Sequence, residues 1–379
     1  MSNTSNIHIV SFQVPYPADY GGAIDVFYKA MALKKAGYRI TLHTFAYDNR
    51  EYSNALLEIA DNIHLYKRNT GILKLFSPLP YIVKSRESDE LLANLLKDDA
   101  PILFEGAHTT YYLSLPQLKE RKKFVRTHNI ESDYYKQLAT ASHSIYKKLF
   151  FLSESWKLKH YEPKLSQADI LFAITEKDKE ELKKICPATT VELLPCFHNG
   201  RFEDIYSQET GTGDYVLYNG NLSVEENIKA ALFLIKDVSP CTKGVKWIFA
   251  GKNPSERIIK AARDRGNIEI VANPSDEAMS ALIRHAAVNV LITFQATGIK
   301  LKLLSALCHG GHCIVNSKMI EGSKLENLCT VADSAQEIIS AIESIAKRRI
   351  TRKEIENRKQ ALLGIYDNDK NIRILTKYL

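Results

Sequence analysis

The chain has 379 residues, of which 45% are hydrophobic and 25% are charged, and its formal net charge is +7 at pH 7. This length allows two domains with full-size cores, and the composition is that of an ordinary globular protein. No uncharged run is long enough to span a bilayer, the N-terminus lacks the pattern of a signal peptide, and the cysteines are irregularly spaced. These features exclude a transmembrane bundle and a disulfide scaffold, and they predict a cytoplasmic protein.

The first half opens with a strand, a loop that contains glycine, and a helix. An apolar strand at residues 7–12 leads into a loop that ends in Gly21 and Gly22, and a helix and a second strand at residues 39–45 follow. Such a βαβ unit builds parallel sheets, and paired glycines let the backbone approach a ligand at the carboxyl edge of the sheet. The loop does not match GxGxxG, so we do not expect a nicotinamide dinucleotide.

Polar side chains lie at the end of, or just after, two further predicted strands, which cover residues 102–104 and 124–127. They are Glu105, His108, Arg126, His128 and Glu131. A histidine and a glutamate at the carboxyl end of a strand can position a substrate hydroxyl group, although a lone histidine is more often structural. Both interpretations stay open on the sequence alone.

A basic segment with many aromatic residues comes next. Residues 119–164 contain eleven Lys or Arg and five Asp or Glu, a surplus of six that supplies nearly the whole net charge of +7. We expect a helical excursion over roughly residues 132–165, with most of its aromatic side chains in the core. Its lysines suit an anionic membrane surface, and we therefore predict peripheral contact with the inner face of the membrane. The candidates are Lys122, Lys123, Lys147, Lys148, Lys157 and Lys159.

A polar segment without periodicity separates this half from a second α/β half. Before it, strands are expected at residues 169–174 and 191–194, with Thr175 capping the helix between them. We predict an N-terminal domain, a linker, a C-terminal domain and a final helix that returns to the first domain. Their boundaries are residues 1–196, 197–213, 214–352 and 353–379.

The second half repeats the strand and helix pattern. A strand at residues 215–218 precedes a turn that contains Gly220 and Asn221, with Ser223 as the expected helix cap, and a strand at residues 245–250 precedes Lys252. Further strands are expected at residues 268–271, 288–293 and 313–315.

The strand at residues 288–293 leads to Gly298 and then to a helix that begins with two lysines, Lys300 and Lys302. The start of a helix offers unpaired N–H groups and a positive dipole end, so this turn suits a phosphate or diphosphate. An ordinary turn with two solvated lysines explains the pattern equally well.

Taken together, these motifs resemble GT-B glycosyltransferases of family 4 (glycosyltransferases group 1). The resemblance covers most of the chain and rests on the order of its motifs. They are the Pro-Tyr-Pro…Gly-Gly loop at 15–22, Tyr161-Glu162, Ala168-Asp169, Ile174 to Asp178, Tyr218 to Ser223, Phe249 to Lys252 and Thr297 to Lys302.

The resemblance implies an α/β fold of two tandem Rossmann-like domains that face each other across a cleft. The first would bind the acceptor and the second a nucleotide-diphosphate sugar, with retention of configuration and with no cofactor or metal. The resemblance assigns catalytic roles to His128 and Lys300. The predicted donor-binding residues are Gly21, Gly22, Gly220, Asn221, Lys252, Thr297, Gly298, Ile299, Lys300, Lys302 and Ser305. The predicted acceptor-binding residues are Tyr16, Asp19, Glu105, His108, Arg126 and Glu131.

The sequence also departs from the family pattern. Thr297 and Ser305 stand where the family commonly has glutamates, and Asn221 and Glu226 stand where it has an Arg and a Lys for the phosphates. We expect a hexosyltransferase that acts on a glycan or lipid-linked glycan in polysaccharide biosynthesis, with mannose as one candidate sugar and no nucleic-acid partner. The alternatives are a non-catalytic GT-B partner in a glycan-assembly complex and a GT-B nucleotide-sugar epimerase.

The run from Cys308 to Cys313 holds two cysteines and two histidines, but its spacing matches no structural zinc pattern, so no metal is expected.

Overall fold

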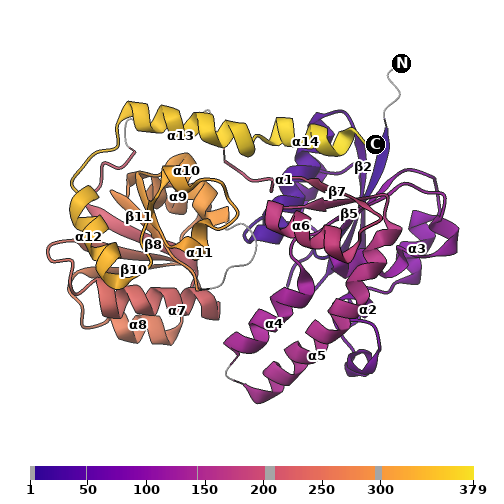
Figure 1. Ribbon diagram of the computed structural model, residues 1–379, viewed down its shortest axis with the longest axis horizontal. Coiled ribbons are helices and arrows are strands. Elements are labelled where there is room, and N and C mark those ends of the chain that lie inside the picture. Colours follow the sequence, from indigo (N-terminus) through magenta and orange to yellow (C-terminus); the bar gives the residue numbers. More distant parts are fainter. Residues whose placement is uncertain (1–4, 48, 143, 201–209, 295–300) are drawn as a thin grey trace. The chain divides into compact units, whose positions relative to one another are not determined.

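The computed structural model describes residues 5–47, 49–142, 144–200, 210–294 and 301–379. The chain forms two compact units (Figure 1). Unit 1 comprises Met1–His198 together with Tyr366–Leu379, and unit 2 comprises Asn199–Ile365. The predicted residues Thr297, Gly298, Ile299 and Lys300 lie outside the described residues.

Unit 1 is built on a sheet that has seven described strands, all of them parallel, in the order β3-β2-β1-β4-β5-β6-β7. The strands at its centre are buried along nearly their whole length, as expected for a parallel sheet covered by helices on both faces. The strands are β1 (Asn6–Ser11), β2 (Arg39–Ala46), β3 (Asn62–Lys67), β4 (Ile102–Glu105), β5 (Lys123–Arg126), β6 (Ile170–Ala173) and β7 (Thr190–Leu193).

The helical segments of unit 1 connect these strands and cover the sheet. The α-helices are α1 (Gly21–Lys35), α2 (Tyr81–Lys84), α3 (Asp89–Leu95), α4 (Glu131–Ala141), α5 (Ile145–Tyr161) and α6 (Glu176–Ile185). The short 3-10 helices are η1 (Asn54–Glu58), η2 (Ile72–Phe76), η3 (Ala107–Tyr112), η4 (Pro116–Leu118) and η5 (Glu162–Gln167). The expected helical excursion after β5 is therefore a hairpin of α4 and α5, and Thr175 caps α6 as expected.

The C-terminal segment is expected from the sequence to be one helix over residues 353–379, and this expectation is wrong. The structure has two helices, α13 (Arg352–Ile365) in unit 2 and α14 (Asn368–Thr376) in unit 1. The side chain of Asp367 accepts hydrogen bonds from the first N–H groups of α14, so it starts a new helix. Ile372 and Leu375 of α14 join the core of unit 1, where α14 lies beside α1. The chain thus returns to the first unit through α14.

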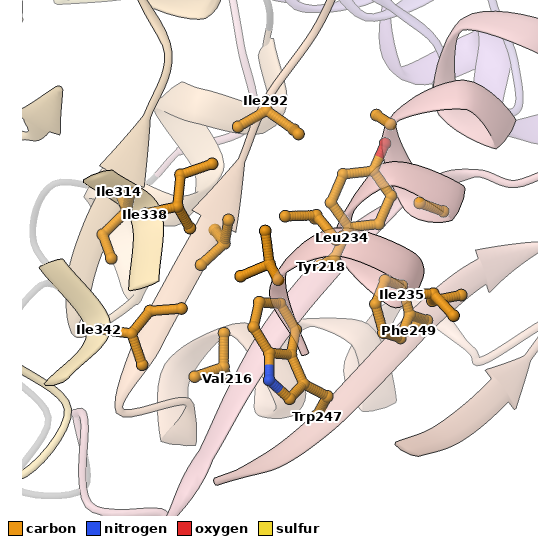
Figure 2. Close-up of a cluster of buried hydrophobic side chains, with 14 of the residues drawn as sticks. Val216, Tyr218, Leu234, Ile235, Trp247, Phe249, Ile292, Ile314, Ile338 and Ile342 are labelled. Atoms are coloured by element: carbon orange, nitrogen blue, oxygen red, sulfur yellow. The ribbon is translucent and has the colours of Figure 1, made fainter. Parts of the chain in front are cut away.

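Unit 2 has a second parallel sheet, with six described strands in the order β10-β9-β8-β11-β12-β13. The strands are β8 (Tyr215–Asn221), β9 (Lys246–Lys252), β10 (Ile268–Ala272), β11 (Val288–Leu291), β12 (His312–Val315) and β13 (Thr330–Val331). Figure 2 shows the core on one face of this sheet, where Trp247 and Phe249 stack with ring centroids 5.8 Å apart. Isoleucines from β12 and α12 (Ala335–Ile345) close the core, as the figure shows for Ile314, Ile338 and Ile342.

The remaining helices of unit 2 are α7 (Glu225–Phe233), the π-helical turn η7 (Leu234–Val238), α8 (Glu256–Ala262), α9 (Asp276–His285), α10 (Leu301–His309), α11 (Ser317–Ile320) and η8 (Glu326–Leu328). The expectation that Ser223 caps α7 is wrong. The N-cap of α7 is Val224, and the Ser223 hydroxyl donates instead to the side-chain oxygen of Asn221. Among the described residues, none of the helices combines the length and apolar content that crossing a bilayer requires.

Candidate functional site

Three loops meet at the carboxyl edge of the first sheet, because β1, β4 and β5 are adjacent in it. The loops that follow these strands carry the predicted site residues of the first half. The strand order therefore brings together side chains that are more than about 100 residues apart in the sequence, such as Asp25 and Arg126. This edge is where open α/β sheets bind ligands.

Lys29 lies at the centre of a buried ionic network at this edge. Its ammonium group is 3.0 Å from Oδ2 of Asp25 and 2.9 Å from Oε2 of Glu105, and all three side chains are buried. Asp25 and Lys29 are one turn apart on α1, whereas Glu105 is the last residue of β4. A cation between two carboxylates compensates both charges, so removing it would leave buried charges without a partner.

Arg126 joins the network from the end of β5. Its guanidinium group donates to both carboxylate oxygens of Asp25 at 3.2 Å, and to main-chain carbonyl groups at the end of β6 and after β7. Burial alone would raise the pKa of Asp25, but Arg126 and Lys29 hold that pKa well below its usual value. Arg126 is fully buried. Its position therefore favours a structural role at the carboxyl edge of the sheet over direct contact with an acceptor.

His128 is the member of this network that solvent reaches. Its Nε2 atom is 3.1 Å from Oε2 of Glu105 and its Nδ1 atom is 3.9 Å from Oδ2 of Asp25, while 11% of its side chain is exposed. An ionised carboxylate can only accept a hydrogen bond, so the N–H group at Nε2 of the imidazole is the donor to Glu105. The contact fixes both the orientation of the ring and the position of its proton.

A second pair, the partly buried His108 and the buried Glu131, lies beside His128. The ring of Phe12 packs against both histidines, with centroid distances of 5.2 Å to His108 and 5.3 Å to His128. Burial lowers the pKa of His108 well below its usual value. Burial, reinforced by the charge of Glu162, raises the pKa of Glu131 to about 8. Among the described residues, the buried Nδ1 atom of His108 has no hydrogen-bond partner, and it is 3.9 Å from Glu131.

The loop after β1 places the other predicted residues of unit 1 on the same edge. Tyr16 is partly exposed, Asp19 forms an ion pair with Arg50, and Gly21 begins α1. A Cβ atom on Gly22 would lie 2.7 Å from the ring of Phe12. A larger residue at this position would therefore displace the ring that packs on both histidines.

The same network holds the one described group with ligand spacing for a metal ion, namely Asp25, Glu105 and His128, whose ligand atoms lie within 4.8 Å of one another. Lys29 already contacts both carboxylates, and Arg126 contacts Asp25. An added cation would have to displace an internal positive charge. The geometry therefore favours an ionic network over a metal site.

The carboxyl edge of the second sheet carries described residues of the predicted donor site that belong to unit 2. Gly220 and Asn221 end β8, and Lys252 ends β9. The ends of these two strands approach each other closely: a Cβ atom added to Gly251 would lie 1.7 Å from the carbonyl oxygen of Gly220. The close approach therefore requires a glycine at position 251.

Lys302 and Ser305 lie on α10, and Lys302 extends toward the end of β8. Its Nζ atom is 3.2 Å from the side-chain oxygen of Asn227 and 5.1 Å from the ring centre of Tyr218. Asn227 in turn donates to the carbonyl oxygen of Asn221 at 3.0 Å. The fold of unit 2 thus brings the predicted residues Lys302 and Asn221 to one place.

An acidic group also lies at this edge. Glu226, in the first turn of α7, accepts a hydrogen bond from the hydroxyl group of Thr293, just after β11. The family pattern has a phosphate-binding lysine at this position. The negative charge of Glu226 is unfavourable for a phosphate, so the lysines of the same edge would have to outweigh it.

The run from Cys308 to Cys313 has ordinary structural roles in the described part of unit 2. Both thiols are buried, and burial raises the pKa of Cys308 to about 12 and that of Cys313 to about 11. The Nε2 atom of His312 lies 2.9 Å from the carbonyl oxygen of Arg348, to which it donates.

Sequence reasoning did not identify Asp25 and Lys29, which anchor the network of unit 1. Their signal was nevertheless present: an aspartate and a lysine four residues apart lie among apolar residues of α1 that the core requires. Charged residues at such positions are seldom buried unless they are paired.

No family model matches the sequence. A protein of Klebsiella pneumoniae, described as an uncharacterized 44.6 kDa protein in the cps region, is 28% identical over 320 residues, which make up 80% of this chain and 80% of that protein. The solved structure of sucrose-phosphate synthase from Thermosynechococcus elongatus matches 99% of this chain and 98% of its own, with a TM-score of 0.72 and 16% identity. HepE from Anabaena, in complex with UDP and glucose, matches 98% of each chain with a TM-score of 0.66 and 10% identity.

Both matches to solved structures extend over nearly the full length of the chain, and each unit by itself has the parallel sheet of a Rossmann-like domain. The chain therefore has the GT-B fold, in which two Rossmann-like domains follow one another.

Proposed function

We propose that the protein is a glycosyltransferase that moves a hexose from a nucleotide-diphosphate sugar to a glycan acceptor. The observation that carries this proposal is the full-length GT-B fold, one example of which is a structure in complex with UDP and glucose. We assign donor binding to the second unit and acceptor binding to the first. A hexose such as mannose, retention of configuration and an acceptor carried on a lipid are the finer parts of the same proposal.

In the proposed reaction an acceptor hydroxyl oxygen bonds to the anomeric carbon of the sugar while the bond from that carbon to the diphosphate breaks. The acceptor's proton passes to the departing diphosphate, so atoms and charges balance without a cofactor. The task of the protein is to stabilise the charge that develops on the diphosphate, which fixed cations and N–H groups do well. Lys302, together with Lys300, is suited to this role. His128, oriented by Glu105, is suited to hold a sugar or acceptor hydroxyl.

A second candidate function is that of a non-catalytic nucleotide-sugar-binding partner in glycan assembly. The observation in its favour is Glu226, whose carboxylate lies at the edge where phosphates would bind. A protein of this kind would bind a nucleotide sugar without releasing the nucleoside diphosphate.

A thermal-shift screen of nucleotide sugars, followed by an assay for nucleoside diphosphate release, tests both candidates. A ligand at 100 times its dissociation constant stabilises the folded protein by about 2.7 kcal/mol, which such a screen detects readily. The glycosyltransferase proposal expects at least one nucleotide sugar that both stabilises the protein and is turned over. Stabilisation without turnover supports the partner, and the absence of any stabilising nucleotide sugar contradicts both.

A further inference from the structure

Helix α5 exposes a continuous apolar face. Ile145, Leu149, Leu152 and Trp156 follow one another at spacings of three or four residues, so they share one side of the helix. Their exposed fractions are 61%, 59%, 44% and 63%. Large apolar side chains grouped in this way on a protein surface mark a site of interaction.

This apolar face is not the side of the helix that packs on unit 1. The inward side carries Glu154, Leu158 and Tyr161, all of which are buried. The sequence predicts most aromatic residues of this segment in the core, which is correct for Tyr161 but wrong for Trp156 and for Tyr146, which is 83% exposed. The stripe therefore lies on the side of α5 opposite the residues that are buried in unit 1. Figure 1 shows the hairpin that α5 forms with α4.

The short helix η2 adds exposed apolar groups next to α5. Ile72, Leu73 and Phe76 are 71%, 81% and 82% exposed. The ammonium group of Lys157 on α5 donates to the carbonyl oxygen of Leu75 at 2.8 Å, which ties η2 to the helix. We call these apolar residues of α5 and η2 the α5–η2 surface.

The charges around this surface are positive. Lys147, Lys148 and Lys159 of α5 are exposed. Spacing places Lys148 and Lys159 beside the stripe, because they are one turn from Leu152 and Trp156 respectively. The one acidic residue of α5, Glu154, is buried and accepts hydrogen bonds from the main-chain N–H of Tyr81 and from Lys157.

The other lysines that the sequence suggests for membrane contact are engaged elsewhere. Lys123 is buried, Lys122 donates to main-chain carbonyl groups at the C-terminus, and Lys157 binds η2 and Glu154. Of the six candidates, Lys147, Lys148 and Lys159 remain exposed, and Lys148 and Lys159 are the two beside the apolar stripe.

We propose that the α5–η2 surface docks unit 1 on an anionic lipid bilayer. A helix with leucine, isoleucine and tryptophan on one side and lysines beside them lies in the headgroup region, where the apolar groups enter the acyl boundary and the lysines contact anionic lipids. A second copy of the chain fits this surface less well than a bilayer does. In a two-fold dimer the α5–η2 surfaces of the two copies would contact each other, so lysines would face lysines and repel. The surface would place the acceptor-binding unit at a membrane, where a lipid-linked acceptor resides.

The two tryptophans of the chain make a direct test available. Trp247 is fully buried in the core of unit 2, whereas Trp156 is 63% exposed on the proposed surface. With vesicles of phosphatidylcholine and phosphatidylglycerol at low salt, the protein should sediment and its tryptophan emission should shift to the blue. High salt should release it, because ions screen the lysines. Trp156→Phe should abolish the blue shift.

Matched variants distinguish vesicle binding through this surface from nonspecific vesicle binding by the rest of the protein. The double variant Leu149→Gln/Leu152→Gln should reduce vesicle partitioning by at least about tenfold, because each leucine loses its burial in lipid. The control Leu57→Gln/Leu96→Gln changes two leucines of unit 1 that are 51% and 45% exposed, and should partition as the wild type does. Likewise Lys148→Glu/Lys159→Glu should abolish sedimentation, while Lys183→Glu/Lys184→Glu on α6, with the same change in net charge, should not.

Three results would overturn the proposal: no sedimentation of the wild type with anionic vesicles, equal sedimentation of the stripe variant and its control, or a blue shift that persists in Trp156→Phe. A wild type that dimerises without lipid, and a stripe variant that is monomeric, would assign the surface to a second copy instead. Because the assay contains no nucleotide sugar, its outcome does not depend on the proposed transferase activity.

Discussion

The Nε2 atom of His128 lies 3.1 Å from Oε2 of Glu105, and the ammonium group of Lys29 lies 2.9 Å from the same oxygen. The imidazole is thus the exposed end of a chain of buried charges that begins on α1. This relationship separates two roles within one network. In the proposed function His128 contacts a ligand, whereas Lys29 and Asp25 stabilise the carboxyl edge of the sheet.

His128→Ala should therefore lower turnover more than it lowers stability. Losing a hydrogen bond between the imidazole and a substrate hydroxyl should slow transfer by roughly tenfold or more, while the melting temperature should change by only a few degrees. Steady-state kinetics and thermal unfolding measured on the same preparation test this. A collapse of the melting temperature with unchanged specific activity would show that the role of His128 is structural.

Lys29→Met should strongly destabilise the protein, because it leaves Asp25 and Glu105 with too little positive charge in a buried site. We expect a loss of about 3–5 kcal/mol in the free energy of unfolding. Lys35→Met is the matched control, since Lys35 lies on the same helix but is 70% exposed in its pair with Asp369, and it should change stability by less than about 1 kcal/mol. Urea unfolding measures both, and equal midpoints for the two variants would refute the assignment.

Lys302→Ala should weaken binding of a nucleotide-diphosphate sugar by roughly ten- to a hundredfold, because a charge-assisted contact to a phosphate is lost. Lys260→Ala removes an exposed lysine from α8 of the same unit and should leave binding unchanged. Calorimetric titration compares them. The sequence makes the same prediction for Lys300→Ala, and wild-type binding by both the Lys300 and Lys302 variants would place the anion site elsewhere.

The stability of unit 1 should fall as the pH rises toward 8, because burial raises the pKa of Glu131 to about 8. The folded state holds this proton more tightly than the unfolded state, in which the pKa is 4.5. The stabilisation is therefore fully present below about pH 4.5 and is lost as the pH rises through about 8, at a rate of up to about 1.4 kcal/mol per pH unit. Glu131→Gln should flatten this dependence. Parallel curves for wild type and variant between pH 5 and pH 9 would contradict it.

Much of the fold follows from the sequence because a parallel sheet buries both faces of its strands. Central strands such as β4 and β11 are short apolar runs, and the residues just after them mark the carboxyl edge. This is why the sequence alone predicts that Glu105, His128 and Lys252 lie at strand ends. β13 was missed because it has two residues and no pattern to detect.

What the sequence did not reveal depends on contacts between distant segments. The pairing of Lys29 with Glu105 follows from the adjacency of α1 and β4, which no local pattern contains. The exposure of Trp156 depends on which side of α5 packs on α2, where Leu158 and Tyr161 are buried with Ile82 and Val83. An aromatic residue on an amphipathic helix predicts burial more readily than exposure. The break before α14 was visible only as Asp367, which could be taken for a polar residue within a longer helix.

Glycosyl transfer from a nucleotide-diphosphate sugar can be tested by the release of nucleoside diphosphate. A panel of nucleotide sugars would be incubated with a bacterial lipid extract as the acceptor source and with either the wild type or His128→Ala. We expect that at least one nucleotide sugar yields nucleoside diphosphate and a glycosylated lipid with the wild type, and that His128→Ala slows both. Absence of release from every nucleotide sugar by the folded wild type, or equal release by both proteins, would contradict the proposed transfer.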